Sequence, residues 1–113
     1  MAPIQLMKLS NIWHQRIYLL EFSMLKILED LIILARERKS NPVEGSYTNK
    51  LLEDKSLAKE KVLEEINELI EAIEKDTNKI HEAADVFYHL IMYLERSGIK
   101  MEEVMKELNN RRK

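Results

Sequence analysis

The stretch that decides the fold is Lys61–Asp85, which reads KVLEEINELIEAIEKDTNKIHEAAD. It contains two acidic pairs, Glu65 with Glu68 and Glu82 with Asp85, and the members of each pair are three residues apart. On a helix this spacing places both carboxylates on one face, about one turn apart. Two such helices lying antiparallel would gather four carboxylates. Because clustered negative charges require cations and Mg²⁺ prefers oxygen ligands, the stretch predicts a magnesium site.

Outside this stretch, apolar residues also recur at three- and four-residue steps, as one face of a helix requires. The pattern predicts a short helical turn at 47–52 and helices over about 24–39, 56–75, 77–97 and 101–111. Ser56 is expected to cap one of these helices, and Asp76 or Thr77 to cap the next. Gly98 suits the left-handed position that follows a helix end. The sequence therefore predicts an all-α chain of four to five helices.

The helix predicted over 56–75 has one apolar stripe that is expected to face the core. The stripe consists of Val62, Ile66, Leu69, Ile70 and Ile73. Glu65 and Glu68 lie on the flank of this stripe, beside the core, whereas Glu64 points to the far side. The helical periodicity therefore predicts that Glu65 and Glu68 lie near the core and that Glu64 faces solvent.

The helix predicted over 77–97 is apolar over most of its circumference. Its main stripe consists of Ile80, Ala84, Phe87, Ile91 and Leu94. Glu82, Asp85 and His89 lie on the opposite side. Such a helix is expected to be buried on two sides, which would place its acidic strip in an interior cleft.

Composition bounds the possible functions. A chain of 113 residues with 45% apolar residues fits one domain with a modest core. A net charge of −2 argues against a general nucleic-acid partner, and the lack of cysteine excludes thiolate metal sites and cysteine nucleophiles. No apolar run approaches the roughly 20 residues that a membrane span needs. The N-terminus lacks a signal-peptide pattern, so a cytoplasmic location is expected.

Each candidate residue also has a structural interpretation, and the residues alone leave both open. Glutamate-rich helices often arise as solvated faces, although Glu82 and Asp85 interrupt an apolar helix and buried acids need partners. His89 is either a satisfied structural histidine or a group that contacts a phosphate or orients a ligand. Tyr47 suits packing with a hydrogen-bonding tip. The basic side chains of Arg38, Lys50 and others could meet a polyanion or simply be surface charges.

Three motifs resemble the phosphoribosyl-ATP pyrophosphatase family of histidine biosynthesis. They are GSYT at 45–48 with KLL at 50–52, KVLEE at 61–65, and EAADVFYH at 82–89. The acidic parts alone are shared by the wider MazG-like all-α nucleotide pyrophosphohydrolases, and the GSYT and Tyr-His elements narrow the resemblance to the histidine pathway. The likeness covers about 24–112, so residues 1–23 are expected to be an extension of uncertain structure before a domain over 24–113. Leu63 stands where the family usually has Gly, and its side of the helix lies away from Glu65 and Glu68.

The resemblance implies an enzyme that hydrolyses phosphoribosyl-ATP to phosphoribosyl-AMP and pyrophosphate. It implies a catalytic Mg²⁺ site formed by Glu65, Glu68, Glu82 and Asp85, with Glu64 as a further candidate ligand. The candidates for substrate binding are Ser46, Tyr47, Thr48, Lys50, Lys61, His89 and Arg38. The resemblance also implies a homodimer or higher homo-oligomer, in which a second subunit completes the helical bundle, and neither nucleic acid nor membrane is an expected partner.

Two other functions remain open. A house-cleaning pyrophosphohydrolase of (deoxy)nucleoside triphosphates would share the acidic pairs but would not need the Gly45–Lys50 element. A non-enzymatic helical oligomerisation module would need neither. Release of pyrophosphate from phosphoribosyl-ATP, compared with a panel of nucleotides, separates these hypotheses.

Overall fold

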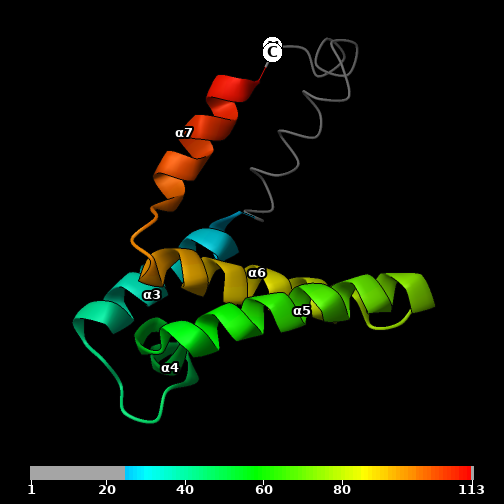
Figure 1. The fold of residues 1–113 in the computed structure, drawn as a ribbon. Coiled ribbons are helices and arrows are strands. Elements are labelled where there is room, and N and C mark those ends of the chain that lie inside the picture. The colour runs from blue at the N-terminus through cyan, green and yellow to red at the C-terminus, as the bar shows by residue number, and fades with distance from the viewer. Residues whose placement is uncertain (1–24, 113) are drawn as a thin grey trace, which may run out of the picture. The chain divides into compact units, whose positions relative to one another are not determined.

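The computed structural model describes residues 25–112, and within them the chain forms five helices and no strand (Figure 1). The helices are α3 (Lys26–Ser40), α4 (Tyr47–Glu53), α5 (Lys55–Lys75), α6 (Lys79–Arg96) and α7 (Met101–Arg111). The predicted all-α class is therefore confirmed, and the short turn expected at 47–52 is a helix of seven residues. The extension expected over 1–23 lies outside the described residues.

The chain divides into two compact units after Asp30. In the described part of the first unit, Lys26 forms an ion pair of 3.2 Å with Asp30 along α3. The architecture below is that of the second unit, from Leu31 onward. None of the helices in residues 25–112 is long and apolar enough to span a membrane.

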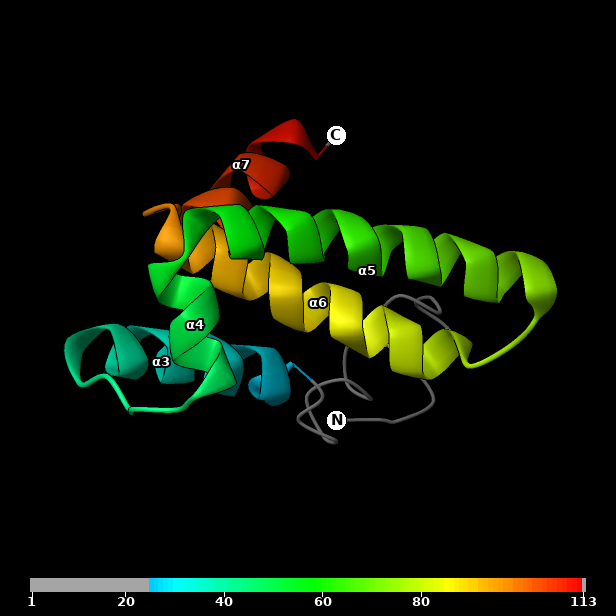
Figure 2. The ribbon, with the colours of Figure 1, turned by 60° about the horizontal axis from the view of Figure 1, so that its bottom comes forward.

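The two longest helices of the second unit, α5 and α6, lie side by side and antiparallel in both views (Figures 1 and 2). The short helix α4 packs against both of them, near the start of α5 and the end of α6. A turn of three residues, 76–78, connects α5 to α6. Asp76 and Asn78 adopt left-handed conformations in this turn, with φ of 56° and 38°, which asparagine and aspartate tolerate better than most residues.

The structure corrects two of the three predicted helix caps. Asp54, not Ser56, caps α5, because its carboxylate accepts a hydrogen bond of 3.0 Å from the Leu57 amide. Asp76 ends α5 and does not begin α6, which instead follows Asn78 without a side-chain cap. A short polar side chain near a helix start fits several positions, so the sequence did not discriminate among them. Gly98 has a φ of 76° just after α6, as predicted.

The faces of α5 and α6 that become buried are not the apolar stripes that the sequence predicted. On α5 the buried residues are Ala58, Glu65 and Ala72, which recur every seven residues along one line of the helix. Ile70 and Ile73, from the predicted stripe of α5, are 51% and 57% exposed. Small alanine side chains allow the two helices to approach closely, so this line of α5 faces α6. The contact between the two helices along this line is called the seam below.

A similar correction applies to α6. Its buried residues are His89, Ile91, Met92 and Glu95. Ile80 and Phe87, from the predicted main stripe, are 88% and 54% exposed, and only Ile91 of that stripe is buried. Within residues 25–112, Ile91 of the main stripe and His89 of the opposite side are buried, but most of the predicted main stripe stays open, so α6 is covered on two sides only near its end.

Arg36 of α3 connects three helices through its guanidinium group. Its Nε atom donates to Glu95 Oε1 on α6 and its Nη2 atom donates to Glu95 Oε2, each over 3.1 Å. Its Nη1 and Nη2 atoms also donate to Glu102 on α7, over 2.9 and 2.6 Å. Hydrogen bonding by Arg36 lowers the pKa of Glu102 to about 2. Because no residue of α7 is buried, this ion pair is a principal tie between α7 and the rest of the unit.

Replacing Arg36 with glutamine should destabilise the fold, because Glu95 is only 4% exposed and would remain as a buried carboxylate without a cation. The free energy of unfolding should fall by about 2–4 kcal/mol. Chemical denaturation followed by circular dichroism measures the change. Arg111→Gln is the matched control, since its pair with Glu107 is exposed on both sides and should contribute less than about 1 kcal/mol. Equal effects of the two substitutions would contradict the role of Arg36.

Candidate functional site

The seam between α5 and α6 gathers the four acidic residues that the sequence singled out. Carboxylate oxygens of Glu65, Glu68 and Glu82 lie within 4.8 Å of one another, and a second group with the same spread contains His81, Glu82 and Asp85. Glu82 belongs to both groups, so they form one cluster, called here the acidic cluster. The antiparallel arrangement of α5 and α6 thus places both acidic pairs together, as the spacing predicted.

His81 is a member of the acidic cluster that the sequence analysis did not select. Its Nε2 atom lies 3.4 Å from Asp85 Oδ2, one helical turn away on α6. The signal was present in the sequence as a histidine and an aspartate four residues apart. An imidazole nitrogen beside carboxylates can either add a metal ligand or provide a positive charge when protonated.

Burial makes the charged forms of the central acids unfavourable. Burial, followed by the hydrogen bond and charge of Glu68, raises the pKa of Glu65 to about 7. Burial, followed by the charge of Glu68, also raises the pKa of Glu82. Glu65 Oε2 and Glu82 Oε2 are buried and have no hydrogen-bond partner among the described residues. A cation between these oxygens would satisfy both atoms, so the residues fit a hard divalent ion such as Mg²⁺.

Lys61 and Glu64 lie at the edge of the acidic cluster. Lys61 Nζ is 3.0 Å from Glu64 Oε2 and 4.0 Å from Glu65 Oε1. The hydrogen bond to Glu64 raises the pKa of Lys61, which keeps this ammonium group charged. The side chain of Glu64 is half exposed and belongs to neither carboxylate group. Its predicted role as a further ligand has no geometric support.

Ser46 and Arg38 stabilise the loop that connects α3 to α4. Ser46 Oγ caps α4 by accepting a hydrogen bond of 3.2 Å from the Asn49 amide, and it accepts another of 2.7 Å from Arg38 Nη1. The buried side chain of Asn49 accepts from Val43 N over 2.9 Å and donates to Arg38 O over 3.0 Å. Asn49 escaped the sequence analysis because a buried asparagine has no periodic signature. These bonds hold the loop and the start of α4 in one shape.

Tyr47, Thr48 and His89 join α4 to α6. The Tyr47 hydroxyl lies 2.9 Å from His89 Nε2, and Thr48 Oγ1 lies 2.5 Å from the hydroxyl of Tyr88. His89 Nδ1 lies 2.7 Å from the backbone oxygen of Asp85. Both ring nitrogens of His89 therefore have partners within the chain, and the ring is 6% exposed. The candidate substrate contacts of the GSYT element thus fix α4 beside the acidic cluster.

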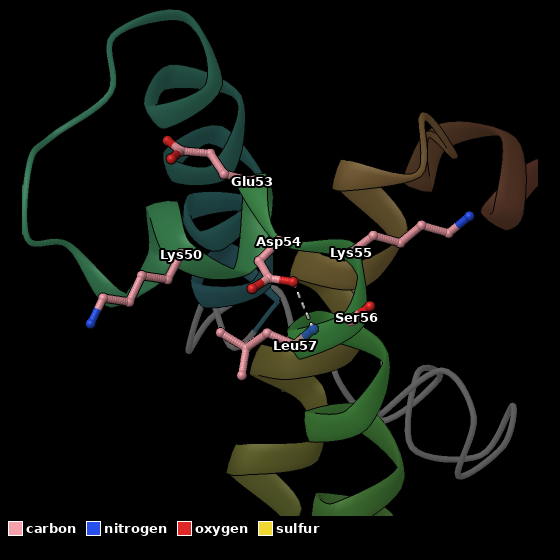
Figure 3. A pocket seen from close by; sticks show the side chains of 6 residues that line it. All are labelled: Lys50, Glu53, Asp54, Lys55, Ser56 and Leu57. Atoms are coloured by element: carbon pink, nitrogen blue, oxygen red, sulfur yellow. Dashed lines mark hydrogen bonds between the residues drawn. The ribbon is translucent and has the colours of Figure 1, made fainter.

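Lys50, another candidate substrate contact, lies in a hollow at the junction of α4 and α5. The hollow is lined by Lys50, Glu53, Asp54, Lys55, Ser56 and Leu57. Figure 3 shows the Lys50 and Lys55 side chains pointing away from the junction in opposite directions, while the Asp54 carboxylate turns toward the Leu57 amide. The two ammonium groups do not converge on one ligand, so the hollow lacks the character of an anion site.

A second hollow lies beside the acidic cluster, at the end of the helix pair where α5 turns into α6. Its lining includes Glu68 and Glu82 together with Lys75, Thr77 and Asn78. The carboxylates of the acidic cluster are thus reachable from this end.

An all-helical domain that gathers carboxylates from two antiparallel helices fits the all-α nucleotide pyrophosphohydrolases, the class that its acidic motifs resemble. A family model described as phosphoribosyl-ATP pyrophosphohydrolase matches residues 28–112. The chain belongs to this family, and the predicted enzyme class, a hydrolase of histidine biosynthesis, is confirmed with it.

Relatives in several organisms support the same family. The phosphoribosyl-ATP pyrophosphatase of Clostridium acetobutylicum is 47% identical over 92 residues, which cover 76% of this chain and 81% of the relative. That of Clostridium novyi is 43% identical over 93 residues, covering 77% and 82%. The histidine biosynthesis bifunctional protein HisIE of Pyrococcus furiosus is 40% identical over 102 residues, covering 88% of this chain and 47% of the relative. No solved structure matches the chain significantly.

Stability without metal should depend on pH through Glu65. Because its pKa in the folded state, about 7, lies above the ordinary 4.5, folding favours the protonated form. The free energy of unfolding in chelator should therefore be largest near pH 5 and fall by up to about 3 kcal/mol toward pH 8. Denaturant unfolding at fixed protein concentration measures this fall.

The matched variant for this prediction is Glu65→Gln, which carries no titrating group at the centre of the seam. Its unfolding free energy should change less between pH 5 and pH 8, with only the raised pKa of Glu82 contributing in the same direction. A wild-type curve that rises over this window would contradict the burial of Glu65 as an unfavourable charge.

Proposed function

We propose that the chain hydrolyses phosphoribosyl-ATP to phosphoribosyl-AMP and pyrophosphate, with Mg²⁺ held by Glu65, Glu68, Glu82 and Asp85. The observation that supports this proposal is a pair of buried oxygens inside the acidic cluster, one on Glu65 and one on Glu82, that have no hydrogen-bond partner within residues 25–112. Buried carboxylates without partners are costly, so their presence favours a cation as part of the working site. Membership of the phosphoribosyl-ATP pyrophosphohydrolase family supplies the substrate.

The reaction breaks the bond that joins the α and β phosphates. A water molecule attacks the α phosphorus, the bridging oxygen leaves with pyrophosphate, and the attacking water loses a proton. When bound, Mg²⁺ would neutralise the triphosphate and polarise a phosphoryl oxygen. A carboxylate of the acidic cluster accepts the proton from the attacking water. The chain has no cysteine, and this route needs no nucleophile from the protein.

Lys61 is the residue proposed to contact the phosphates. Lys61 borders the acidic cluster through Glu65, and its raised pKa keeps it cationic. Lys50 is exposed on α4, and its predicted contact with the substrate stays a prediction without supporting geometry. The other predicted substrate contacts are proposed to hold α4 in place, because their polar atoms form hydrogen bonds within the chain. They are Arg38, Ser46, Tyr47, Thr48 and His89.

Pyrophosphate release tests the proposal against its alternatives. Phosphoribosyl-ATP should be turned over far better than any member of a panel of nucleoside and deoxynucleoside triphosphates. A preference for deoxynucleoside triphosphates would favour the house-cleaning function. An absence of activity on every triphosphate would favour the oligomerisation module. Full activity in excess chelator would overturn the metal-dependent mechanism.

Glu68→Gln should lower kcat/KM by more than about a hundredfold, because it removes one charge from the acidic cluster and a ligand of the proposed ion. The fold should persist, as judged by circular dichroism. Glu74→Gln is the matched control, since Glu74 lies on the same helix, is exposed and belongs neither to the acidic cluster nor to the lining of the hollow beside it. Near-normal turnover by Glu68→Gln would remove this residue from the site.

We also propose that a second copy of the chain covers the open apolar face of α5 and α6. This face includes Ile66, Ile70, Ile73, Ile80 and Phe87, each at least 38% exposed in the single chain. So many large apolar side chains on two adjacent helices mark a contact surface. The periodicity that predicts a buried stripe on each helix then agrees with the structure, because the stripes would be buried between subunits.

Phe87→Glu should shift the protein from dimer to monomer in sedimentation velocity, because a charge would enter the apolar interface. Val43→Glu is the control, since Val43 is 48% exposed but lies in the loop before α4. A wild-type protein that sediments as a monomer at micromolar concentration would refute the proposed dimer.

A cytoplasmic location is the remaining part of this proposal. It rests on relatives that are named as histidine biosynthesis proteins.

A further inference from the structure

His81 adds a nitrogen atom to the acidic cluster, in which the ligand atoms of the other members are carboxylate oxygens. Its ligand nitrogen and the ligand oxygens of Glu82 and Asp85 all lie within 4.8 Å of one another. Glu82 also belongs to the group of Glu65 and Glu68, so the imidazole borders the same acids that are proposed to hold the ion. Mg²⁺ takes oxygen ligands, whereas an imidazole nitrogen suits first-row transition-metal ions. The set of donors is therefore mixed, and Mg²⁺ would use only its oxygen part.

The distance between His81 and Asp85 suits two ligands of one ion. The Nε2 atom of His81 lies 3.4 Å from Asp85 Oδ2, which is longer than the roughly 2.7–3.2 Å of an ordinary hydrogen bond from nitrogen to oxygen. Two ligands that each lie about 2.1 Å from a tetrahedral ion such as Zn²⁺ are about 3.4 Å apart. The two residues are four positions apart on α6, so the helix itself places them on one face, one turn apart.

A separate observation indicates that the acidic cluster lacks a cation. Glu65 is only 6% exposed, and its Oε2 atom has no hydrogen-bond partner within residues 25–112. The same holds for the Oε2 atom of Glu82, the residue shared with the group of His81. The side chain of His81 is 70% exposed, so it can turn toward an ion without disturbing packed residues. The cluster thus combines buried oxygens that need a cation with an accessible nitrogen that can bind one.

We infer that His81 is a further ligand of the acidic cluster, and that its nitrogen makes the cluster select a first-row transition-metal dication, such as Co²⁺ or Zn²⁺, over Mg²⁺. This inference rests on the proposed metal site and names the class of ion that the site prefers. The imidazole donates the lone pair of Nε2 to the transition-metal ion, and Mg²⁺ binds through the carboxylates alone. Removing the nitrogen should therefore weaken the binding of one class of ion and not of the other.

The experiment compares Co²⁺ and Mg²⁺, each titrated alone into the full chain after treatment with chelator and its removal. Titration calorimetry at about pH 8, where an ordinary imidazole is neutral, gives both affinities without substrate. His81→Gln should weaken Co²⁺ binding by at least about tenfold, since even groups that only orient metal ligands cost that much. It should change Mg²⁺ binding by less than about twofold. Circular dichroism should show an intact fold, because glutamine is a good helix former at an exposed position.

Two further variants make the comparison specific. His14→Gln is the matched control, because it removes the same imidazole from a histidine that lies outside the described residues, and it should leave both affinities unchanged. A larger loss of Co²⁺ affinity in His14→Gln than in His81→Gln would overturn the assignment of His81. His81→Glu replaces the nitrogen ligand with a carboxylate, so it should keep or strengthen Mg²⁺ binding while it lowers the preference for Co²⁺.

Proton NMR of the protein loaded with Co²⁺ provides a readout that does not depend on affinity or activity. A histidine that binds this paramagnetic ion directly has strongly shifted ring protons. The wild-type protein should show one such set of signals, which should be present in His14→Gln and absent in His81→Gln. Signals that persist in His81→Gln would show that another residue supplies the nitrogen.

The outcomes separate this inference from the function on which it rests. If His81 acted only through its charge or its contact with Asp85, His81→Gln would change the affinities for Co²⁺ and Mg²⁺ by the same factor. That result would overturn the ligand role of His81 and leave the proposed metal site in place. A wild-type protein that binds neither ion would overturn the metal site and, with it, this inference.

Discussion

The rest of the structure depends on the packing of α5 against α6 through a line that carries a glutamate at its centre. Ala58 and Ala72 bring the helices close, and Glu65 sits between them with an oxygen that has no partner among the described residues. Apolar side chains at that point would give a more stable helix pair. The cost of burying Glu65 beside Glu68 and Glu82 is therefore the physical sign of a site where charge is needed. The remaining elements hold this unfavourable seam together.

Three sets of contacts offset that cost, two at the start of α4 and one at the end of α6. The loop before α4 is fixed by Ser46 and the buried Asn49. The first turn of α4 is fixed to α6 through Tyr47 and Thr48. At the far end of α6, Arg36 holds Glu95 and Glu102 together. The GSYT motif thus stabilises the geometry of the site, and a motif that names a family need not touch the substrate.

The sequence predicted the helices and the acidic cluster well, and it predicted the burial of their faces poorly. Helix existence and the acidic pairs follow from local periodicity, which a single chain contains. Local periodicity does not determine which face of a helix packs inside the single chain. It indicates an apolar surface that becomes buried, but not whether the same chain or a second copy covers it. Ile70 and Phe87 were therefore assigned to the core of one chain, although they are open within residues 25–112. The sequence analysis did not find the contact of Asn49 with Arg38 or that of Arg36 with Glu95. These residues are 11 and 59 positions apart, so no local pattern revealed the contacts.

The three-residue turn at 76–78 has a consequence for how the chain can vary. Each residue of a helix advances the side-chain direction by about 100°, so the length of this turn sets which side of α6 faces α5. Asp76 and Asn78 adopt left-handed backbone conformations to close the turn in so few residues. One inserted residue would rotate Glu82 away from Glu65 while leaving both helices intact. The length of this turn therefore fixes how the two acidic pairs face each other, and an insertion or deletion here would separate them.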